Sequence, residues 1–346
     1  MKALVKTQKG KGFLEVREVP EPTIGDTEVL IEVKACGVCG TDLHIFQDEF
    51  PYYPPVILGH EFAGIVKSVG SMVTGWKPGD RVVGEPHTKA CGKCYLCRTG
   101  NPQVCLSKRS PGWGIDGAFA PLMRFPDPHL LHAIPADMPF QAAAMIEPLA
   151  NVVTDIVLNQ VIMPGDVVVV AGPGPIGMMA ALVSKHSGAG HVVMLGTNSD
   201  EAMRLKLCRT LPAIDTVINI QHEDVKEKIL SITGNKGCDV FIEASGAAPA
   251  ISMGAGLVKK MGVISAIGLT GREKIDFPYD TLMMKSVKYH FNVSTKYESW
   301  DRAIQFMNQG VIPFDKIITH RSGIENWESI FKELLSQRAL KAIFEF

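Results

Sequence analysis

The sequence predicts a two-domain α/β protein, in which a β-rich, barrel-like part precedes a part built on a parallel sheet. The chain has 346 residues, which is long for one domain and comfortable for two. Up to about residue 150, short alternating runs are divided by Gly and Pro, as in small antiparallel strands. Beyond that point, apolar strands alternate with helical stretches, which indicates parallel pairing with right-handed crossovers.

The strands of the first part are punctuated by turn residues, of which Pro78-Gly79 is the clearest example. Three candidate strands are Val29–Cys36, Phe62–Gly70 and Asp80–Glu85. We assign residues 1–150 to this domain. The segment from about 290 to 346 has an amphipathic helix at Ser299–Asn308 and a strand near Ala342–Phe346, and we expect it to complete the same domain.

The second part, 151–289, begins with a strand at Val167–Ala171, a Gly-rich turn and a helix of about ten residues. The next strand is His191–Leu195, and a helix is expected at Glu223–Ile232. A second helix is expected at Ala250–Lys260. Three further strands are expected at Thr216–Ile220, Asp239–Ala244 and Gly262–Ile267.

Composition excludes several classes of partner. Apolar residues make up 46% of the chain and charged residues 21%, with a net charge of −1 and no basic block. Nucleic acids and acidic membrane surfaces are therefore poor candidates as partners. The N-terminus lacks the long apolar run of a signal peptide, and Val167–Ser184 is short for a membrane span, so we expect a cytoplasmic protein.

Four of the eight cysteines form one cluster, spaced C-x2-C-x2-C-x7-C: Cys91, Cys94, Cys97 and Cys105. A redox motif, a disulfide staple and a metal site are the alternatives. A cytosolic setting disfavours disulfides, and four thiolates at this spacing can surround one tetrahedral zinc ion. Such a site has no free position for substrate, so the interpretation is a structural zinc that holds a long loop together.

A dinucleotide-binding fingerprint follows the strand Val167–Ala171. It reads G-x-G-x-x-G and comprises Gly172, Gly174, Pro175, Ile176 and Gly177 together with Pro173. The first glycine makes the turn, the second lets backbone approach a pyrophosphate, and the third brings helix and strand together. Pro175 falls near the first helical turn, where proline is tolerated.

The choice between NAD and NADP depends on the end of the strand His191–Leu195. A carboxylate is usual there in NAD sites, about 20 residues after the fingerprint, but Gly196 stands in its place. Thr197, Asn198, Ser199 and Arg204 follow as candidate ligands of a 2′-phosphate, which favours NADP. Asp200 could still reach a ribose, so NAD stays open. Ile267 completes the candidate cofactor-binding set.

A second group of candidate ligands is scattered along the chain. Cys39-Gly40-Thr41-Asp42-Leu43-His44 is followed by Gly59-His60-Glu61, and Ile146-Glu147-Pro148 comes later. Alone, each residue has an ordinary structural explanation, such as a buried thiol, a core histidine or a paired carboxylate. Their combination with the cysteine cluster and the glycine turn changes that interpretation.

Over essentially its whole length the chain resembles the zinc-dependent medium-chain dehydrogenases, especially the polyol (sorbitol-type) and threonine-type members. The resemblance implies a GroES-like catalytic domain completed by the C-terminal tail, and a Rossmann domain with a doubly wound parallel sheet. It implies a catalytic zinc held by Cys39, His60, Glu61 and Glu147, with direct ligation by either glutamate left open. Asp42 matches the carboxylate that orients the zinc-bound histidine.

The same resemblance implies a reaction. Zinc acidifies an alcohol, Thr41 and His44 relay its proton to solvent, and hydride passes to the nicotinamide across an interdomain cleft. The expected substrate is a polyol, sugar or cyclitol, although Tyr289, beside Lys288, stands where sorbitol dehydrogenases carry a substrate-binding arginine. Two roles are open for Trp113: a position near the cleft, or the simpler role of packing against other side chains.

Two alternatives stay open: a threonine-type or simple secondary-alcohol dehydrogenase, and a non-catalytic dinucleotide-binding zinc protein. Retention of the ligands and of both relay residues disfavours the second. Family members are commonly tetramers or dimers, so a homo-oligomer is expected by resemblance, with no nucleic-acid or membrane partner.

Overall fold

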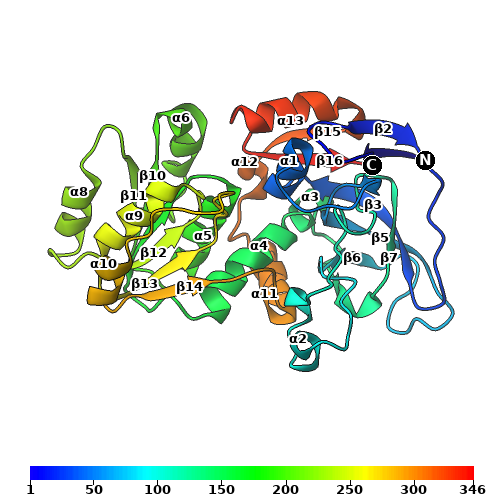
Figure 1. Cartoon of the computed structure of the whole chain (residues 1–346), viewed down its shortest axis with the longest axis horizontal. Coiled ribbons are helices and arrows are strands. Elements are labelled where there is room, and N and C mark those ends of the chain that lie inside the picture. Colours follow the sequence, from blue (N-terminus) through cyan, green and yellow to red (C-terminus); the bar gives the residue numbers. More distant parts are fainter. The chain divides into compact units, whose positions relative to one another are not determined.

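The computed structural model describes residues 1–346, and the chain divides into two compact units. Unit 1 comprises Met1–Ala150 and Val293–Phe346, and unit 2 comprises Asn151–Asn292. Both termini therefore belong to unit 1 (Figure 1). Each unit encloses a hydrophobic core of its own.

Unit 1 is built on two sheets whose strands are antiparallel except for the pair β15 and β16. A three-stranded sheet has the order β2-β1-β4, and the larger sheet has the order β15-β16-β3-β5-β6-β8, with β7 paired to β3. The antiparallel, β-rich expectation for this part is confirmed. The strands are β1 Lys2–Lys6, β2 Leu14–Glu18, β3 Val29–Gly37, β4 Val56–Ile57, β5 Glu61–Val69, β6 Arg81–Gly84, β7 Leu122–Phe125, β8 Leu131–Ala133, β15 Ile318–Ser322 and β16 Lys341–Glu345.

The C-terminal tail enters the larger sheet because β16 pairs with β3, which sets Ile343 opposite Gly37. Unit 1 also contains helices, and the last residues of α4 fall beyond Ala150 and so belong to unit 2. These helices are α1 Gly40–Gln47, α2 Tyr95–Arg98, α3 Phe140–Ala143, α4 Ile146–Val153, α11 Tyr297–Asn308, α12 Phe314–Ile317 and α13 Trp327–Leu335. The helical stretch Phe140–Leu158 has the length and apolar character of a membrane span, but 78% of its most apolar window is buried within the protein, as in a core helix.

Unit 2 is a six-stranded, wholly parallel sheet in the order β11-β10-β9-β12-β13-β14. The parallel, doubly wound expectation is confirmed. Its strands are β9 Val167–Ala171, β10 His191–Gly196, β11 Thr216–Asn219, β12 Cys238–Glu243, β13 Val258–Ala266 and β14 Lys288–Phe291. Its helices are α5 Pro175–His186, α6 Asn198–Asp200, α7 Lys206–Cys208, α8 Val225–Ile232, α9 Ala248–Leu257 and α10 Tyr279–Met284.

One helix prediction is wrong at its end. The helix expected to continue to Lys260 stops at Leu257, and β13 begins at Val258 instead of Gly262. A distant residue fixes this boundary, because Lys285 Nζ donates hydrogen bonds to the carbonyls of Ala255, Gly256 and Val258, at 2.7, 3.0 and 2.8 Å. A lysine that binds the last carbonyls of a helix stabilises its end.

Candidate metal and dinucleotide sites

The first candidate site is organised by the start of α1. Cys39 is the N-cap residue of this helix, and its backbone N–H donates to the carboxylate of Asp42 at 2.9 Å. The other Asp42 oxygen accepts the N–H of Gly59 at 3.3 Å. Because Gly59 directly precedes His60, the buried Asp42 carboxylate ties the Cys39 turn to the His60 segment.

Cys39, His60 and Glu61 converge, with one ligand atom of each within 4.8 Å of the others. His60 lies just before β5, and Glu61 is its first residue; both are buried. Burial alone would lower the pKa of His60, but the Cys39 thiolate, followed by Asp42 and Glu147, raises it well above the usual value. The Nδ1 atom of His60 is buried and has no hydrogen-bond partner within the chain. A thiol, an imidazole and a carboxylate form a donor set that suits zinc.

Glu147 lies in the first turn of α4 and is buried, but it falls outside that group of three. Its charge nevertheless acts on the site, because it raises the pKa of both His60 and Lys341. The structure therefore brings three of the four predicted ligands together and leaves Glu147 in the surrounding layer.

The two predicted relay residues lie on α1. The Thr41 hydroxyl is 3.7 Å from the Cys39 sulfur. His44 lies one turn further along, with its Nδ1 atom 3.1 Å from the Glu49 carboxylate and its side chain 44% exposed. A hydroxyl at the buried cluster and an imidazole at the surface are thus carried by a single helix.

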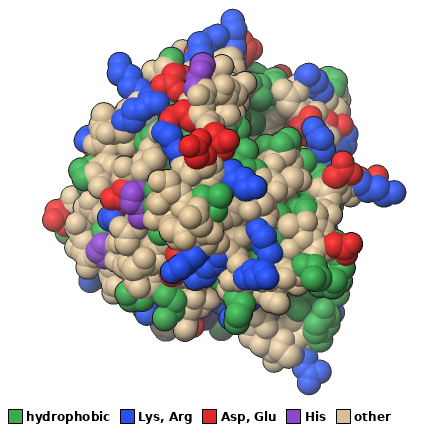
Figure 2. Space-filling model, turned by 90° about the vertical axis from the view of Figure 1, so that its left-hand side faces the viewer, with side chains coloured by type: hydrophobic (Ala, Val, Ile, Leu, Met, Phe, Trp, Pro, Cys, Tyr) green, Lys and Arg blue, Asp and Glu red, His purple; other side chains and the backbone are tan.

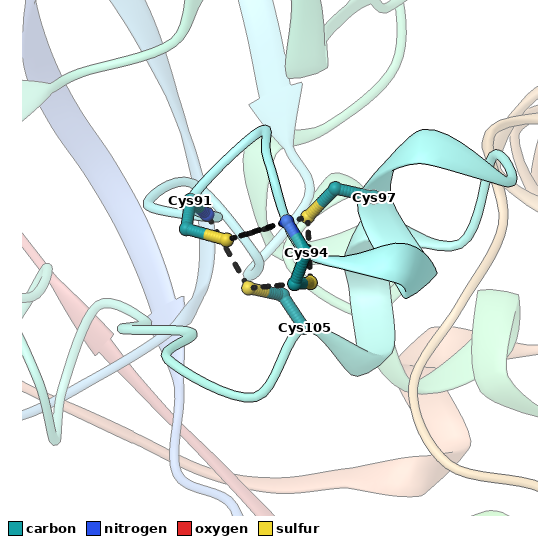
Figure 3. Close-up of side chains that lie close together, drawn as sticks. All are labelled: Cys91, Cys94, Cys97 and Cys105. Carbon is teal, nitrogen blue, oxygen red and sulfur yellow. Dashed lines mark hydrogen bonds between the residues drawn. The ribbon is translucent and has the colours of Figure 1, made fainter.

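The four clustered cysteines face one another in a second site (Figure 3). The Sγ–Sγ distances are 3.5 Å for Cys94–Cys97, 3.9 Å for Cys94–Cys105 and 4.0 Å for Cys91–Cys97. A tetrahedral zinc with Zn–S bonds of about 2.3 Å separates its sulfurs by roughly 3.8 Å. Backbone N–H groups of Lys93 and Cys94 lower the pKa of Cys91 to about 6, which favours the thiolate that a metal requires.

The predicted dinucleotide turn connects β9 to α5. Gly172 has a φ of +103°, which favours glycine, and a Cβ at Gly177 would overlap the carbonyl oxygen of Gly172. Gly174, the N-cap residue, faces open space, so a ligand can approach its backbone. Pro175 is the first residue of the helix, followed by Ile176.

The residues after β10 form a bonded network. Asp200 is buried; one of its oxygens accepts hydrogen bonds from the Thr197 N–H and hydroxyl at 3.0 and 2.9 Å, and the other lies 3.1 Å from Arg204 Nη1. Asn198 and Ser199 are exposed. At Gly196, an added Cβ would meet the end of the Leu205 side chain at 2.7 Å, so a larger residue there would require Leu205 to move. Ile267 follows β13, and its N–H donates to the Glu243 carbonyl at 2.8 Å.

Two other residues singled out from the sequence, Tyr289 and Trp113, pack against aromatic side chains. Tyr289 lies in β14, where its ring stacks on Phe291 with centroids 4.6 Å apart, and it also contacts Phe277. Trp113 packs edge-on against Phe50, with ring centroids 6.0 Å apart. The packing role considered for Trp113 is therefore present in unit 1.

Sequence reasoning missed Lys341. Its ammonium group pairs with Glu61 inside unit 1, with a side chain only 5% exposed. The available signal was a lone lysine inside the apolar run Ala339–Phe344. A charged residue at such a position is rarely buried unless it is paired, but the sequence does not name the partner.

Comparisons with known proteins identify relatives across the whole chain. Residues 25–136 match the sequence profile of the alcohol dehydrogenase GroES-like domain, and residues 175–309 match that of the zinc-binding dehydrogenases. A sorbitol dehydrogenase of Halalkalibacterium halodurans is 38% identical, with 99% of this chain and 98% of that protein aligned. An L-threonine 3-dehydrogenase of Sinorhizobium fredii is 36% identical over 100% of this chain and 99% of its own.

Solved structures agree. A zinc-binding dehydrogenase from Sinorhizobium meliloti, crystallised with bound NADP, superposes with a TM-score of 0.91 at 28% identity. The superposition covers 100% of this chain and 99% of that one. Two domains of the kinds described above are thus joined in the same order in a known class of proteins.

Proposed function

This chain belongs to the zinc-binding alcohol dehydrogenases of the medium-chain family, and from that membership we propose that it oxidises a secondary alcohol of a polyol, sugar or cyclitol. As a member it is an NAD(P)-dependent zinc oxidoreductase that acts on a small alcohol. The observation that carries the proposal is the group formed by the half-buried Cys39 and the buried His60 and Glu61, on which the charge of Glu147 also acts. The 38% identical sorbitol dehydrogenase and the sequence Glu147-Pro148-Leu149 support the polyol class.

We assign two zinc ions to the chain. Cys39 and His60, with direct ligation by either Glu61 or Glu147, would hold the catalytic ion, and the four cysteines from Cys91 to Cys105 would hold the structural one. The orphaned Nδ1 of the buried His60 supports the first assignment, and the sulfur separations support the second. Zinc bound at the first site would make a substrate hydroxyl more acidic.

The chain's own residues then handle the proton. The Thr41 hydroxyl, next to Cys39, would accept it within the buried site. His44 would deliver it to water, because its imidazole is partly exposed and lies against the Glu49 carboxylate. A histidine suits this step because its unperturbed pKa is close to neutral. The glycine turn would hold the dinucleotide, whose nicotinamide would supply the acceptor for the hydride of the substrate carbon.

For the dinucleotide we propose a preference for NADP. Asp200 is buried and its oxygens already accept hydrogen bonds from Thr197 and Arg204, which makes it a poorer partner for a ribose 2′-hydroxyl than a free carboxylate. The exposed Asn198 and Ser199 side chains would meet a 2′-phosphate instead. A solved relative at 28% identity carries NADP, which is in keeping with this choice.

A threonine-type activity is the second candidate, because L-threonine 3-dehydrogenases match this chain at 35–36% identity over nearly its whole length. Substrate choice between a polyol and an amino acid depends on polar groups that contact the substrate beyond its reacting hydroxyl. A direct comparison of both substrate classes is therefore part of the test below.

We also propose a cytoplasmic homo-oligomer, a dimer or tetramer. None of the eight cysteines is paired in a disulfide, which suits a reducing compartment. The edge strand β14 carries Phe291, which is 74% exposed, and the neighbouring Met284 is 73% exposed. On the face of unit 2 drawn in Figure 2, hydrophobic side chains gather along the lower right rim. An open strand edge with exposed apolar side chains is suited to pairing with another chain.

The proposed function is tested by a substrate panel combined with metal analysis. Purified protein is assayed with polyols, sugars, cyclitols, threonine and short secondary alcohols, each with NAD⁺ and NADP⁺. The highest kcat/KM is expected for a polyol or cyclitol with NADP⁺, together with two zinc ions per chain. Highest kcat/KM for threonine would establish the second candidate, and active protein free of zinc would refute the mechanism.

Matched cysteine variants separate chemistry from folding. Cys39→Ser is expected to abolish turnover and to remove one zinc while dinucleotide binding persists. Cys208→Ala changes a buried cysteine of unit 2 that belongs to neither cluster, and it should retain both zinc ions. Equal loss of activity in both variants would contradict the assignment of Cys39.

A further inference from the structure

The buried ion pair between Lys341 and Glu61 has a bearing on metal chemistry. We propose that Lys341 is a positioning residue, whose ammonium group holds the Glu61 carboxylate and limits its competition with substrate for the catalytic metal. This inference rests on the proposed function, because it takes Cys39, His60 and Glu61 as the centre that binds the metal.

Lys341 reaches the site from the far end of the chain. It is the first residue of β16, and the pairing of β16 with β3 brings it beside the turn that carries Cys39. Its Nζ donates hydrogen bonds to Glu61 Oε2 and, at 3.0 Å, to the carbonyl oxygen of Val38. With side chains 5% and 1% exposed, Lys341 and Glu61 are both removed from water. This geometry fixes the position of the carboxylate.

A second observation is that the neighbouring strand β3 leaves room for the Glu61 carboxylate. Gly37 lies opposite Glu61 in the pairing of β3 with β5, and a Cβ at Gly37 would overlap Glu61 Oε2. The backbone of Gly37 is not in the left-handed region, so conformational freedom does not explain the glycine. Space for the Glu61 carboxylate does explain it.

The Lys341 ammonium group lies against the Glu61 carboxylate, which is also a candidate ligand of the metal. Glu61 exerts the strongest electrostatic attraction on this ammonium group, followed by Cys39 and Glu147. Lys341 thus places a basic group at the edge of the proposed metal centre. Hydrogen bonds between charged groups are stronger than those between neutral groups, so the Lys341 ammonium group competes with a metal ion for the Glu61 carboxylate.

The consequence concerns the open coordination position. A catalytic zinc keeps one position for water or substrate, and an additional anionic ligand would close it. A carboxylate whose charge is already matched by an ammonium group is a weaker ligand than a free one. Removing the charge of Lys341 should therefore strengthen Glu61 as a ligand, tighten metal binding and hinder entry of the substrate oxygen.

The experiment uses Lys341→Met and the charge-retaining Lys341→Arg, each in the native chain and in a Glu61→Gln background. Zinc is exchanged for Co²⁺, and a Cys39→Ser protein supplies the spectrum of the cysteine cluster for subtraction. Lys341→Met should change the visible Co²⁺ bands and slow loss of the metal to a chelator on the order of tenfold. Its KM for substrate should rise more than its kcat falls. Lys341→Arg should keep the native spectrum, and Lys341→Met should have no effect on metal release when Glu61 is already Gln.

Two results would overturn the inference: an unchanged Co²⁺ spectrum in Lys341→Met, or an equal change in metal release in both backgrounds. If Lys341→Met does not fold, Lys341→Gln takes its place, because an amide can still donate to the Val38 carbonyl without carrying charge. A native protein that holds no metal at Cys39 would overturn the proposed function itself. Metal at Cys39 with no dependence on Lys341 would overturn only this inference.

Discussion

Asp155 offers a prediction whose size follows from burial. It lies in the π-helical segment Thr154–Leu158 that continues α4, and the residue is 4% exposed. Burial raises its pKa from 3.8 to about 7. At pH 8 the folded chain therefore holds a carboxylate in surroundings that favour the neutral acid. Asp155→Asn replaces that acid with a neutral group of the same shape.

The sign of the effect follows from the two pKa values. An acid whose pKa is higher in the folded state makes the folded chain bind more protons, so stability is greatest below pH 3.8 and falls until about pH 7. A difference of about three pKa units corresponds to an upper bound of about 4 kcal/mol at pH 8. The variant lacks this penalty. Its advantage in free energy of unfolding should grow by about 2 kcal/mol between pH 5.5 and pH 8.

The assay is urea unfolding followed by tryptophan fluorescence at pH 5.5, 6.5 and 8, with zinc and dinucleotide concentrations held constant. Asp215→Asn is the matched control, because Asp215 lies 2.8 Å from Lys185 and its pKa is lowered, so the same chemical change should destabilise the chain. An Asp155→Asn advantage that does not vary with pH, or a loss of stability at pH 8, would refute the argument.

Three further predictions concern the structural zinc site, the dinucleotide turn and the proton relay. Cys97→Ser should lower the zinc content by one ion per chain and lower the Tm while the Cys39 site keeps its metal; unchanged stoichiometry would contradict the structural zinc. Gly177→Ala should lower the Tm of the cofactor-free protein because its Cβ overlaps the Gly172 carbonyl. Gly174→Ala should leave that Tm unchanged and weaken dinucleotide binding, as calorimetry can measure; equal effects of both substitutions would refute the distinction. His44→Ala should lower kcat on the order of a hundredfold at neutral pH, with recovery in imidazole buffer, and an unaffected kcat would remove His44 from the relay.

The sequence predicted elements whose ends are set by neighbouring residues, and it missed a helix end at which a residue far along the chain makes the contacts. The strand Val167–Ala171 was predicted to the residue because a run of valines ends at a glycine turn. The end of α9 was missed because Lys285, far along the chain, binds its final carbonyls. Helix propensity alone would have continued to Lys260, and the distant contact overrides it.

The candidate sites also divide into one that the local spacing of residues predicts and one that depends on contacts between distant segments. The four cysteines within Cys91–Cys105 could be grouped from spacing, because their loop is short enough to bring the sulfurs together. Cys39 and His60 were joined only by resemblance, because the link between their segments is a pair of hydrogen bonds to the Asp42 carboxylate. Lys341 could not be paired with Glu61 at all, since 280 residues separate them and strand pairing alone brings them together.

That ion pair also bears on how unit 1 folds before it holds a metal. A buried carboxylate that lacks a partner would be strongly unfavourable, and Glu61 lies with the Cys39 thiol and Glu147 in a buried site. Lys341 supplies a partner for the Glu61 carboxylate. Because this residue is part of the chain, the partner is present before any metal binds. A divalent cation bound by Cys39 and His60 would add to this positive charge, so the metal and Lys341 would together offset the carboxylates of the site.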